Sequence, residues 1–139
     1  MGQVRRHPVD GLPAVMSVSD AQIVINEFVR RFNTLNLDEI SSCFADDVVV
    51  DYAGQPVMNG IQALRAFMQQ RYASVADYSL RKSVRCLTGA VVGVDATVIY
   101  RDTSTDSWMA GRAFEFLTLR DGVIARWDNV AVYRQSARD

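Results

Sequence analysis

Apolar residues recur at helical spacing in three stretches of the first half of the chain. The first stretch follows Ser19, which begins an S-x-x-Q sequence typical of a capped helix start. The second follows Asn36, another capping residue, and predicts a short helix that extends to Phe44. The third follows Asn59 and runs to about Tyr72. These patterns predict three helices, each with one apolar face.

A β-rich pattern dominates the rest of the chain. Residues 48–52 (VVVDY) combine β-branched residues with an aromatic residue and predict a strand. Four further β-rich runs lie at 78–87, 90–100, 108–119 and 123–133. Between the last two runs, an Asp-Gly pair at 121–122 is a strong hairpin signal. Helices followed by an antiparallel meander predict an α+β fold, with the three helices on the concave face of a strongly curved sheet.

Length and composition fit a single domain. The chain has 139 residues, of which 49% are hydrophobic, so it can bury a sizeable core. Residues 1–17 contain two of the three prolines and predict an irregular N-terminal arm. Residues 18–135 are then expected to form one domain.

Charge and cysteine content exclude several classes of function. Fifteen basic and sixteen acidic residues leave a net charge of -1, without the basic excess that binding nucleic acid or a membrane surface requires. No apolar run has membrane-spanning length, and the first residues lack the apolar segment of a secretory leader. Cys43 and Cys86 lack metal-binding spacing, and no glycine-rich phosphate loop is present. We therefore expect a cytoplasmic protein with two free thiols and without a metal or cofactor.

Strand alternation places several apolar side chains on the outer face of the expected sheet. Phe114, Phe116 and Val130 are the main examples. An apolar outer face has to be covered, which favours a homodimer that packs sheet against sheet.

Three segments carry a resemblance to a known superfamily. Phe44-Ala45-Asp46-Asp47 with the strand that follows, the helix start at Gly60, and the run LRDGVIARW at 119–127 resemble the nuclear transport factor 2-like superfamily. The most similar branches are the SnoaL-like, ketosteroid isomerase-like and scytalone dehydratase-like proteins. The resemblance covers about residues 18–135 and implies a cone-shaped barrel around an apolar pocket for a small hydrophobic, steroid- or polyketide-like carbonyl compound. It specifies the fold better than the reaction, because the superfamily contains enzymes and non-enzymes.

Few catalytic groups of these branches carry over position by position. The tyrosine on the first helix of ketosteroid isomerases corresponds to Phe28, which cannot donate a hydrogen bond. Their aspartate base corresponds to Tyr52, with Asp51 on the opposite face, and their second acid corresponds to Glu115. Only the last of these three roles is retained.

The other branches match in part. The aliphatic-Asp-Tyr strand of scytalone dehydratase-like proteins, whose tyrosine positions a water, resembles Val50-Asp51-Tyr52. Those proteins also need histidines, and the only histidine here is His7. The last-strand acid of limonene epoxide hydrolase-like proteins corresponds to Asn129, an amide.

Three residues are candidates for chemistry, each with a structural alternative. Glu115 is an acid in an apolar run, so it either exchanges protons in a pocket, pairs with an arginine on a neighbouring strand, or faces outward. Tyr52 either donates to a ligand or water, or bonds a backbone carbonyl. Asn129 either orients a carbonyl or a water, or bonds a neighbouring strand. Lys82, the only lysine, is the one candidate for Schiff-base chemistry.

Two functional hypotheses follow from these residues. The expected pocket is bounded by Phe28, Phe32, Val50, Tyr52, Met58, Phe67, Glu115, Trp127 and Asn129. One hypothesis is an isomerase, dehydratase or cyclase without a cofactor, in which Glu115 transfers a proton while Tyr52 and Asn129 polarise an oxygen. The other is a ligand-binding or assembly module of the same fold without chemistry.

Overall fold

The structure, a computed structural model, describes residues 16–136. Its elements are α1 (Val18–Phe32), α2 (Leu37–Ser41), β1 (Phe44–Tyr52), β2 (Met58–Asn59), α3 (Ile61–Tyr72), β3 (Val75–Thr88), β4 (Val91–Asp102), β5 (Ser107–Arg120) and β6 (Val123–Gln135). The six strands form one sheet in the order β2-β1-β6-β5-β4-β3. All neighbours are antiparallel except β1 and β6, which are parallel.

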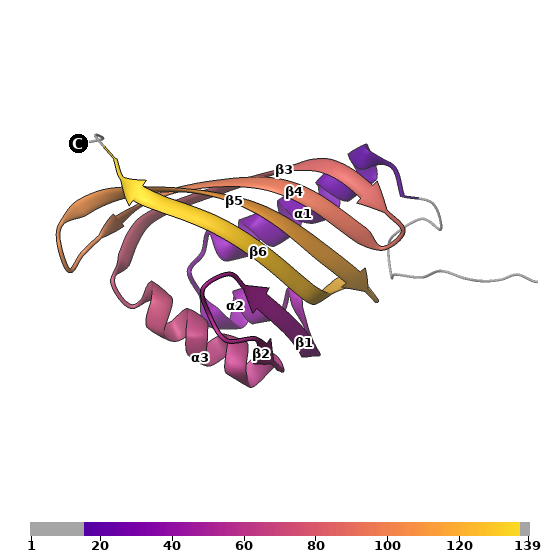
Figure 1. Cartoon of the computed structure of the whole chain (residues 1–139), viewed down its shortest axis with the longest axis horizontal. Helices are drawn as coiled ribbons and strands as arrows, with labels where there is room; N and C mark the ends of the chain where they lie inside the picture. The colour runs from indigo at the N-terminus through magenta and orange to yellow at the C-terminus, as the bar shows by residue number, and fades with distance from the viewer. Residues whose placement is uncertain (1–15, 137–139) are drawn as a thin grey trace, which may run out of the picture.

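The helices lie on one side of a curved, unclosed sheet. The long strands β3 to β6 bend over them, with α1 beneath β3 and α3 beside β1 and β2 (Figure 1). This arrangement confirms the predicted α+β cone fold. Within the residues that the structure describes, no helix is both long and apolar enough to cross a membrane.

The first helix begins two residues earlier than the sequence pattern indicated. Ser17, not Ser19, is the N-cap: its Oγ accepts a hydrogen bond from the Asp20 backbone N–H at 3.1 Å. The Asp20 carboxylate in turn accepts from the Ser17 N–H, also at 3.1 Å. Gln22, the expected box partner, instead bonds the backbone of Lys82 and Val84 and so fastens α1 to β3.

The start of β1 and the cap of α3 also differ from prediction. Phe44 begins β1 rather than ending α2, because the neighbouring Cys43 carbonyl already accepts from the Ile124 N–H on β6. Asn59 belongs to β2 and does not cap α3. The N-cap is Gly60, whose φ of 90° suits glycine and which makes no side-chain cap bond. Asn36 caps α2 as predicted, through bonds to two backbone N–H groups.

The N-terminal arm lies almost entirely outside the described residues, and His7 with it. Ser17, assigned to that arm, is the cap of α1. The limits 18–135 for a single domain stay a prediction.

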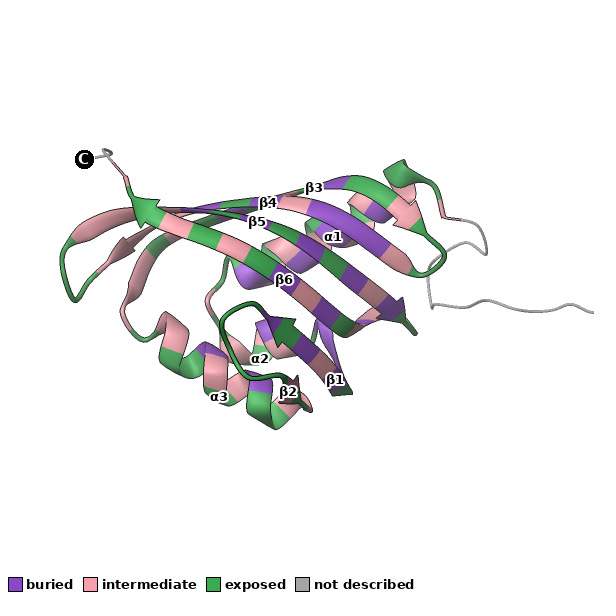
Figure 2. Ribbon diagram, viewed as in Figure 1, coloured by how far each residue is buried: buried purple, intermediate pink, exposed green. Residues whose placement is uncertain are grey.

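The two faces of the sheet alternate as strand geometry requires. On β5, Ala113, Glu115 and Leu117 are buried, whereas Phe114 and Phe116 are 59% and 54% exposed. Figure 2 shows this alternation along β5 and β6. Asp121 and Gly122 both have positive φ, as the predicted hairpin turn requires. The alternation directs Glu115 into the concave side of the molecule.

Candidate functional site

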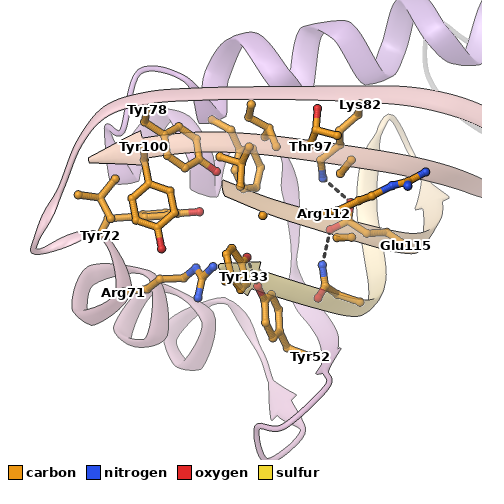
Figure 3. A pocket seen from close by; sticks show the side chains of 18 of the residues that line it. Tyr52, Arg71, Tyr72, Tyr78, Lys82, Thr97, Tyr100, Arg112, Glu115 and Tyr133 are labelled. Carbon is orange, nitrogen blue, oxygen red and sulfur yellow. Dashed lines mark hydrogen bonds and ion pairs between the residues drawn. The ribbon is translucent and has the colours of Figure 1, made fainter. Parts of the chain in front are cut away.

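One cavity of about 150 Å³ lies between the concave face of the sheet and the helices. Its walls come from the end of α1, the end of α3, β1 and the four long strands. Figure 3 shows its two polar ends, with Glu115 and Lys82 at one and Arg71 at the other. The two ends differ in charge and are described in turn.

Glu115 is the centre of a buried polar cluster. Its side chain is 3% exposed. Lys82 Nζ donates to its Oε1 at 2.6 Å, while Trp127 Nε1 and Asn129 Nδ2 donate to its Oε2 at 2.8 and 2.6 Å. The carboxylate is therefore an acceptor of three hydrogen bonds, one of them from a cation. Such compensation is what a charge needs in order to be buried.

Lys82 supplies the cation of this cluster. Its side chain is 6% exposed, and its ammonium lies 5.4 Å from the Phe32 ring centroid and 5.6 Å from that of Trp127. The ion pair therefore comes from a lysine on β3, not from an arginine on a neighbouring strand as the structural alternative supposed. The sequence analysis missed this role, although Leu80 and Val84 flank Lys82 at period two, which indicates an inward position.

Asn129 lies beside Glu115 on β6, opposite it in the ladder. Its amide nitrogen bonds Glu115, so its oxygen faces away from that bond. Among the described residues this Oδ1 is a buried atom without a hydrogen-bond partner. Asn129 lines the cavity, and an unpaired buried oxygen there is unusual enough to make this residue a candidate polar group of the site.

Tyr52 belongs to the same cross-strand row but bonds a different partner. Its hydroxyl lies 2.7 Å from that of Tyr133, a residue that the sequence analysis did not single out. Burial raises the pKa of Tyr52, so the phenol stays protonated. Its bond to a second phenol differs from both alternatives considered for it, a ligand and a backbone carbonyl.

The opposite end of the cavity contains Arg71 and a group of tyrosines. The Arg71 guanidinium lies 4.7 Å from the Tyr133 ring centroid and 5.4 Å from that of Tyr52. Three further tyrosines line this end, namely Tyr72, Tyr78 and Tyr100. Their rings form a chain of contacts that ends at Tyr133. None of these residues was a candidate in the sequence, because their proximity is a tertiary feature.

The structure places five of the nine expected lining residues on the cavity wall: Phe32, Tyr52, Glu115, Trp127 and Asn129. The other four lie elsewhere. Phe28 and Val50 are buried in the core, and Met58 is on β2 at the edge of the sheet. Phe67 packs against the Tyr52 ring, with centroids 5.4 Å apart. These four residues do not line this cavity, which lies under β3 to β6, and a binding role for them stays a prediction.

The thiols and the acidic groups form no further site. Cys43 is buried and Cys86 is exposed, and both are free. Burial raises the pKa of the Cys43 thiol to about 12, so it is not a nucleophile. Within residues 16–136, no cluster of His, Cys, Asp or Glu could hold a metal ion.

A curved sheet folded over helices around one pocket is the cone-shaped architecture of the nuclear transport factor 2-like superfamily. The family model for a SnoaL-like domain matches residues 25–127. The chain therefore belongs to the SnoaL-like domain family. No curated protein matches the sequence.

Several solved structures are similar in fold. One is the epoxide hydrolase/cyclase-like enzyme SalBIII, which is described as having a role in pyran ring formation in the polyether salinomycin. It has a TM-score of 0.73 at 15% sequence identity, and the match covers 85% of this chain and 97% of that one. A candidate polyketide cyclase from Xanthomonas campestris pv. campestris has a TM-score of 0.68 at 24% sequence identity, and the match covers 81% of this chain and 90% of that one. A candidate scytalone dehydratase from Novosphingobium aromaticivorans has a TM-score of 0.66 at 16% sequence identity, and the match covers 88% of this chain and 90% of that one. At these identities the similarity shows the fold alone.

Proposed function

We propose that the protein binds a small hydrophobic carbonyl compound and transfers a proton on it without a cofactor. The observation that carries this proposal is the buried Lys82–Glu115 pair on the cavity wall. A cation beside a carboxylate supplies the two groups that enolisation needs, an electrophile for the oxygen and a base for the carbon acid.

In the proposed reaction, the substrate oxygen accepts a hydrogen bond from Lys82, which has N–H donors beyond the one used by Glu115. Glu115 removes a proton from the adjacent carbon, and the electrons of the broken C–H bond form the enolate. Asn129 holds the carboxylate in place. Return of the proton from Glu115 to another carbon gives isomerisation; alternatively the enolate expels a β-hydroxyl, which takes that proton from Glu115 and leaves as water, and this gives dehydration.

The size of the cavity narrows the substrate class. Its volume is about 150 Å³, whereas typical ligand pockets are about 300–1,000 Å³. An engineered cavity of about 150 Å³ in another protein takes up benzene. The volume of this open-sided cavity therefore favours a ligand whose inserted part is about one ring, rather than a whole fused-ring steroid.

The rival function is a binding module without chemistry. The observation in its favour is that Glu115 already has three donors, as a purely structural pair would. The two functions differ in whether Glu115 exchanges protons with a bound ketone.

A test needs no natural substrate. With 3-cyclohexenone as the probe, conversion to the conjugated 2-cyclohexenone is followed by ultraviolet absorbance, and deuterium uptake next to the carbonyl is followed by NMR. We expect the wild-type protein to accelerate both and Glu115→Gln to be slower by about 10²–10⁴-fold. Asp95→Asn is the matched control, because Asp95 is an acid on the outer face, paired with Arg112. Binding of the ketone without acceleration, or equal rates for Glu115→Gln, would favour the binding module.

We also propose that the protein is a cytoplasmic homodimer. The exposed residues Phe114, Phe116, Val130 and Val132, here called the outer patch, support the dimer. The two free thiols support a reducing compartment.

A further inference from the structure

Arg71 is a cation that the protein itself leaves without a counter-charge. In residues 16–136 it makes neither an ion pair nor a side-chain hydrogen bond, and its contacts are the faces of Tyr52 and Tyr133. Within these residues, Arg81 and Arg134 also make no ion pair or side-chain hydrogen bond, but both are exposed on the surface. Arg71 is half-buried at the end of α3 and lines the cavity. Its N–H groups are therefore available within the pocket.

The surroundings of Arg71 are suited to an anion. Figure 3 shows it reaching from α3 toward Tyr133, on the side of the cavity away from Glu115. Burial raises the pKa of the Tyr72 and Tyr78 phenols, which also hydrogen-bond each other, so both stay protonated and neutral. The one carboxylate among the described residues that lines this end, Asp102, accepts hydrogen bonds from the backbone and hydroxyl of Ser104 and makes none with Arg71.

The shape of the Arg71 guanidinium indicates which anionic group would bind at this end of the cavity. Its planar pair of N–H donors matches a carboxylate in bidentate fashion. One guanidinium balances one negative charge, whereas a phosphate dianion would leave charge uncompensated in a half-buried site. The faces of Tyr52 and Tyr133 hold the guanidinium by cation–π contact and fix its orientation before a ligand arrives.

We propose that this end of the cavity binds the carboxylate of a ring-sized acid, with Arg71 as its main contact. Combined with the proposed function, on which this last step rests, the substrate is a cyclic carbonyl compound that also carries a carboxylate. Its carbonyl oxygen then meets Lys82 while its carboxylate meets Arg71. The two ends of the pocket would thus fix the direction in which the ring enters.

Binding of benzoate and benzamide tests the proposal directly by isothermal titration calorimetry. The two probes share ring and shape and differ in charge. We expect wild-type protein to bind benzoate about tenfold or more tightly than benzamide. Arg71→Met should lose most of this preference while binding benzamide as before, and Arg71→Lys should keep part of it. Arg81→Met, an exposed arginine on β3, is the matched control and should behave as wild type.

Equal affinity for the two probes in the wild-type protein would overturn the proposal, and that measurement depends on no variant. An unchanged benzoate preference in a folded Arg71→Met protein would overturn it as well. The result of this binding experiment can be distinguished from the result of the isomerisation experiment that tests the proposed function. If Arg71-dependent benzoate binding persists while 3-cyclohexenone is not isomerised, the acid site stands and proton transfer does not.

Discussion

At the scale of single residues, the site depends on the compensation of buried charge. Glu115 and Lys82 are both almost fully buried, and each is the other's ion-pair partner. Trp127 and Asn129 supply the remaining bonds of the carboxylate. Removing one charge of such a pair leaves the other charge buried without a partner. The resulting loss in the free energy of unfolding exceeds the stability that the intact pair contributes.

This argument predicts a non-additive effect on stability. Lys82→Met should lower the free energy of unfolding by about 3–5 kcal/mol, because it strands the Glu115 carboxylate. Lys82→Met combined with Glu115→Gln should recover a large part of that loss, because no buried charge remains. Urea denaturation of the two single variants and the double variant measures the coupling. Arg112→Met, in an exposed ion pair with Asp95, is the control and should cost about 1 kcal/mol or less. Additive losses in the double variant would show that the two charges are not coupled.

Strand alternation explains which site residues the sequence could predict. Period two predicted the concave face for Tyr52 and Asn129 but left Glu115 open between the two faces, and all three line the cavity. Lys82 was considered only for Schiff-base chemistry, although its alternation with the buried Leu80 indicated an inward position. Arg71 gave no signal, because nothing in a helix sequence shows which strand will lie against its last turn.

At the scale of elements, the helix starts depend on local hydrogen bonds that several residues can provide. Ser17 and Ser19 both precede the first apolar face, and the structure selects Ser17 with Asp20 as its partner. Gln22 is then released to bond the β3 backbone, which is a tertiary contact. The choice between two plausible caps was therefore decided by packing of α1 on β3.

The two serines provide a test of this assignment. Ser17→Ala should lower the free energy of unfolding by about 1 kcal/mol, because an N–H of the first turn loses its acceptor. Ser19→Ala should have almost no effect, because Ser19 is exposed within the helix. Chemical denaturation of both variants under the same conditions gives the comparison. An equal or larger loss for Ser19→Ala would contradict the assigned cap.

The strands were predicted better than their connections. All four runs of the meander match strands to within a few residues, because long alternating segments and an Asp-Gly turn are strong local signals. The predicted boundary between α2 and β1 was wrong by about one helical turn, because a short apolar run fits the spacing of a helix as well as that of a strand. The parallel pairing of β1 with β6 joins the two ends of the domain and has no local signal.

At the scale of the whole molecule, the sheet has two different faces. The concave face holds the cavity with its two charged ends, and the convex face carries the outer patch. The Arg112 guanidinium lies 5.1 Å from the Phe114 ring centroid and so partly covers the patch. Val130 lies directly opposite Phe114 in the ladder, so the patch is contiguous across β5 and β6. A contiguous apolar surface on a sheet is the kind of surface that proteins cover by association.

The partner that we propose for this face is a second copy of the chain. In a dimer with twofold symmetry the same patch lies on both subunits, so the apolar residues of β5 and β6 would meet their own counterparts. Two sheets packed in this way lie about 10 Å apart, and a stable interface buries roughly 800 Å² per subunit. The cavities would open on the far sides of the two sheets, so each subunit would keep a complete site.

Sedimentation velocity at micromolar concentration tests this assembly. The wild-type protein should sediment with twice the chain mass. Val130→Asp should sediment as a monomer, because it places a charge at the centre of the buried patch without changing the concave face. Ile23→Asp is the matched control: Ile23 is 70% exposed on α1, away from the sheet's outer face, and its variant should remain a dimer. A monomeric wild-type protein would refute the dimer, and a dimeric Val130→Asp variant would move the interface to another surface. Because each subunit holds its own cavity with Arg71, the monomeric variant should still bind benzoate, which separates assembly from the site.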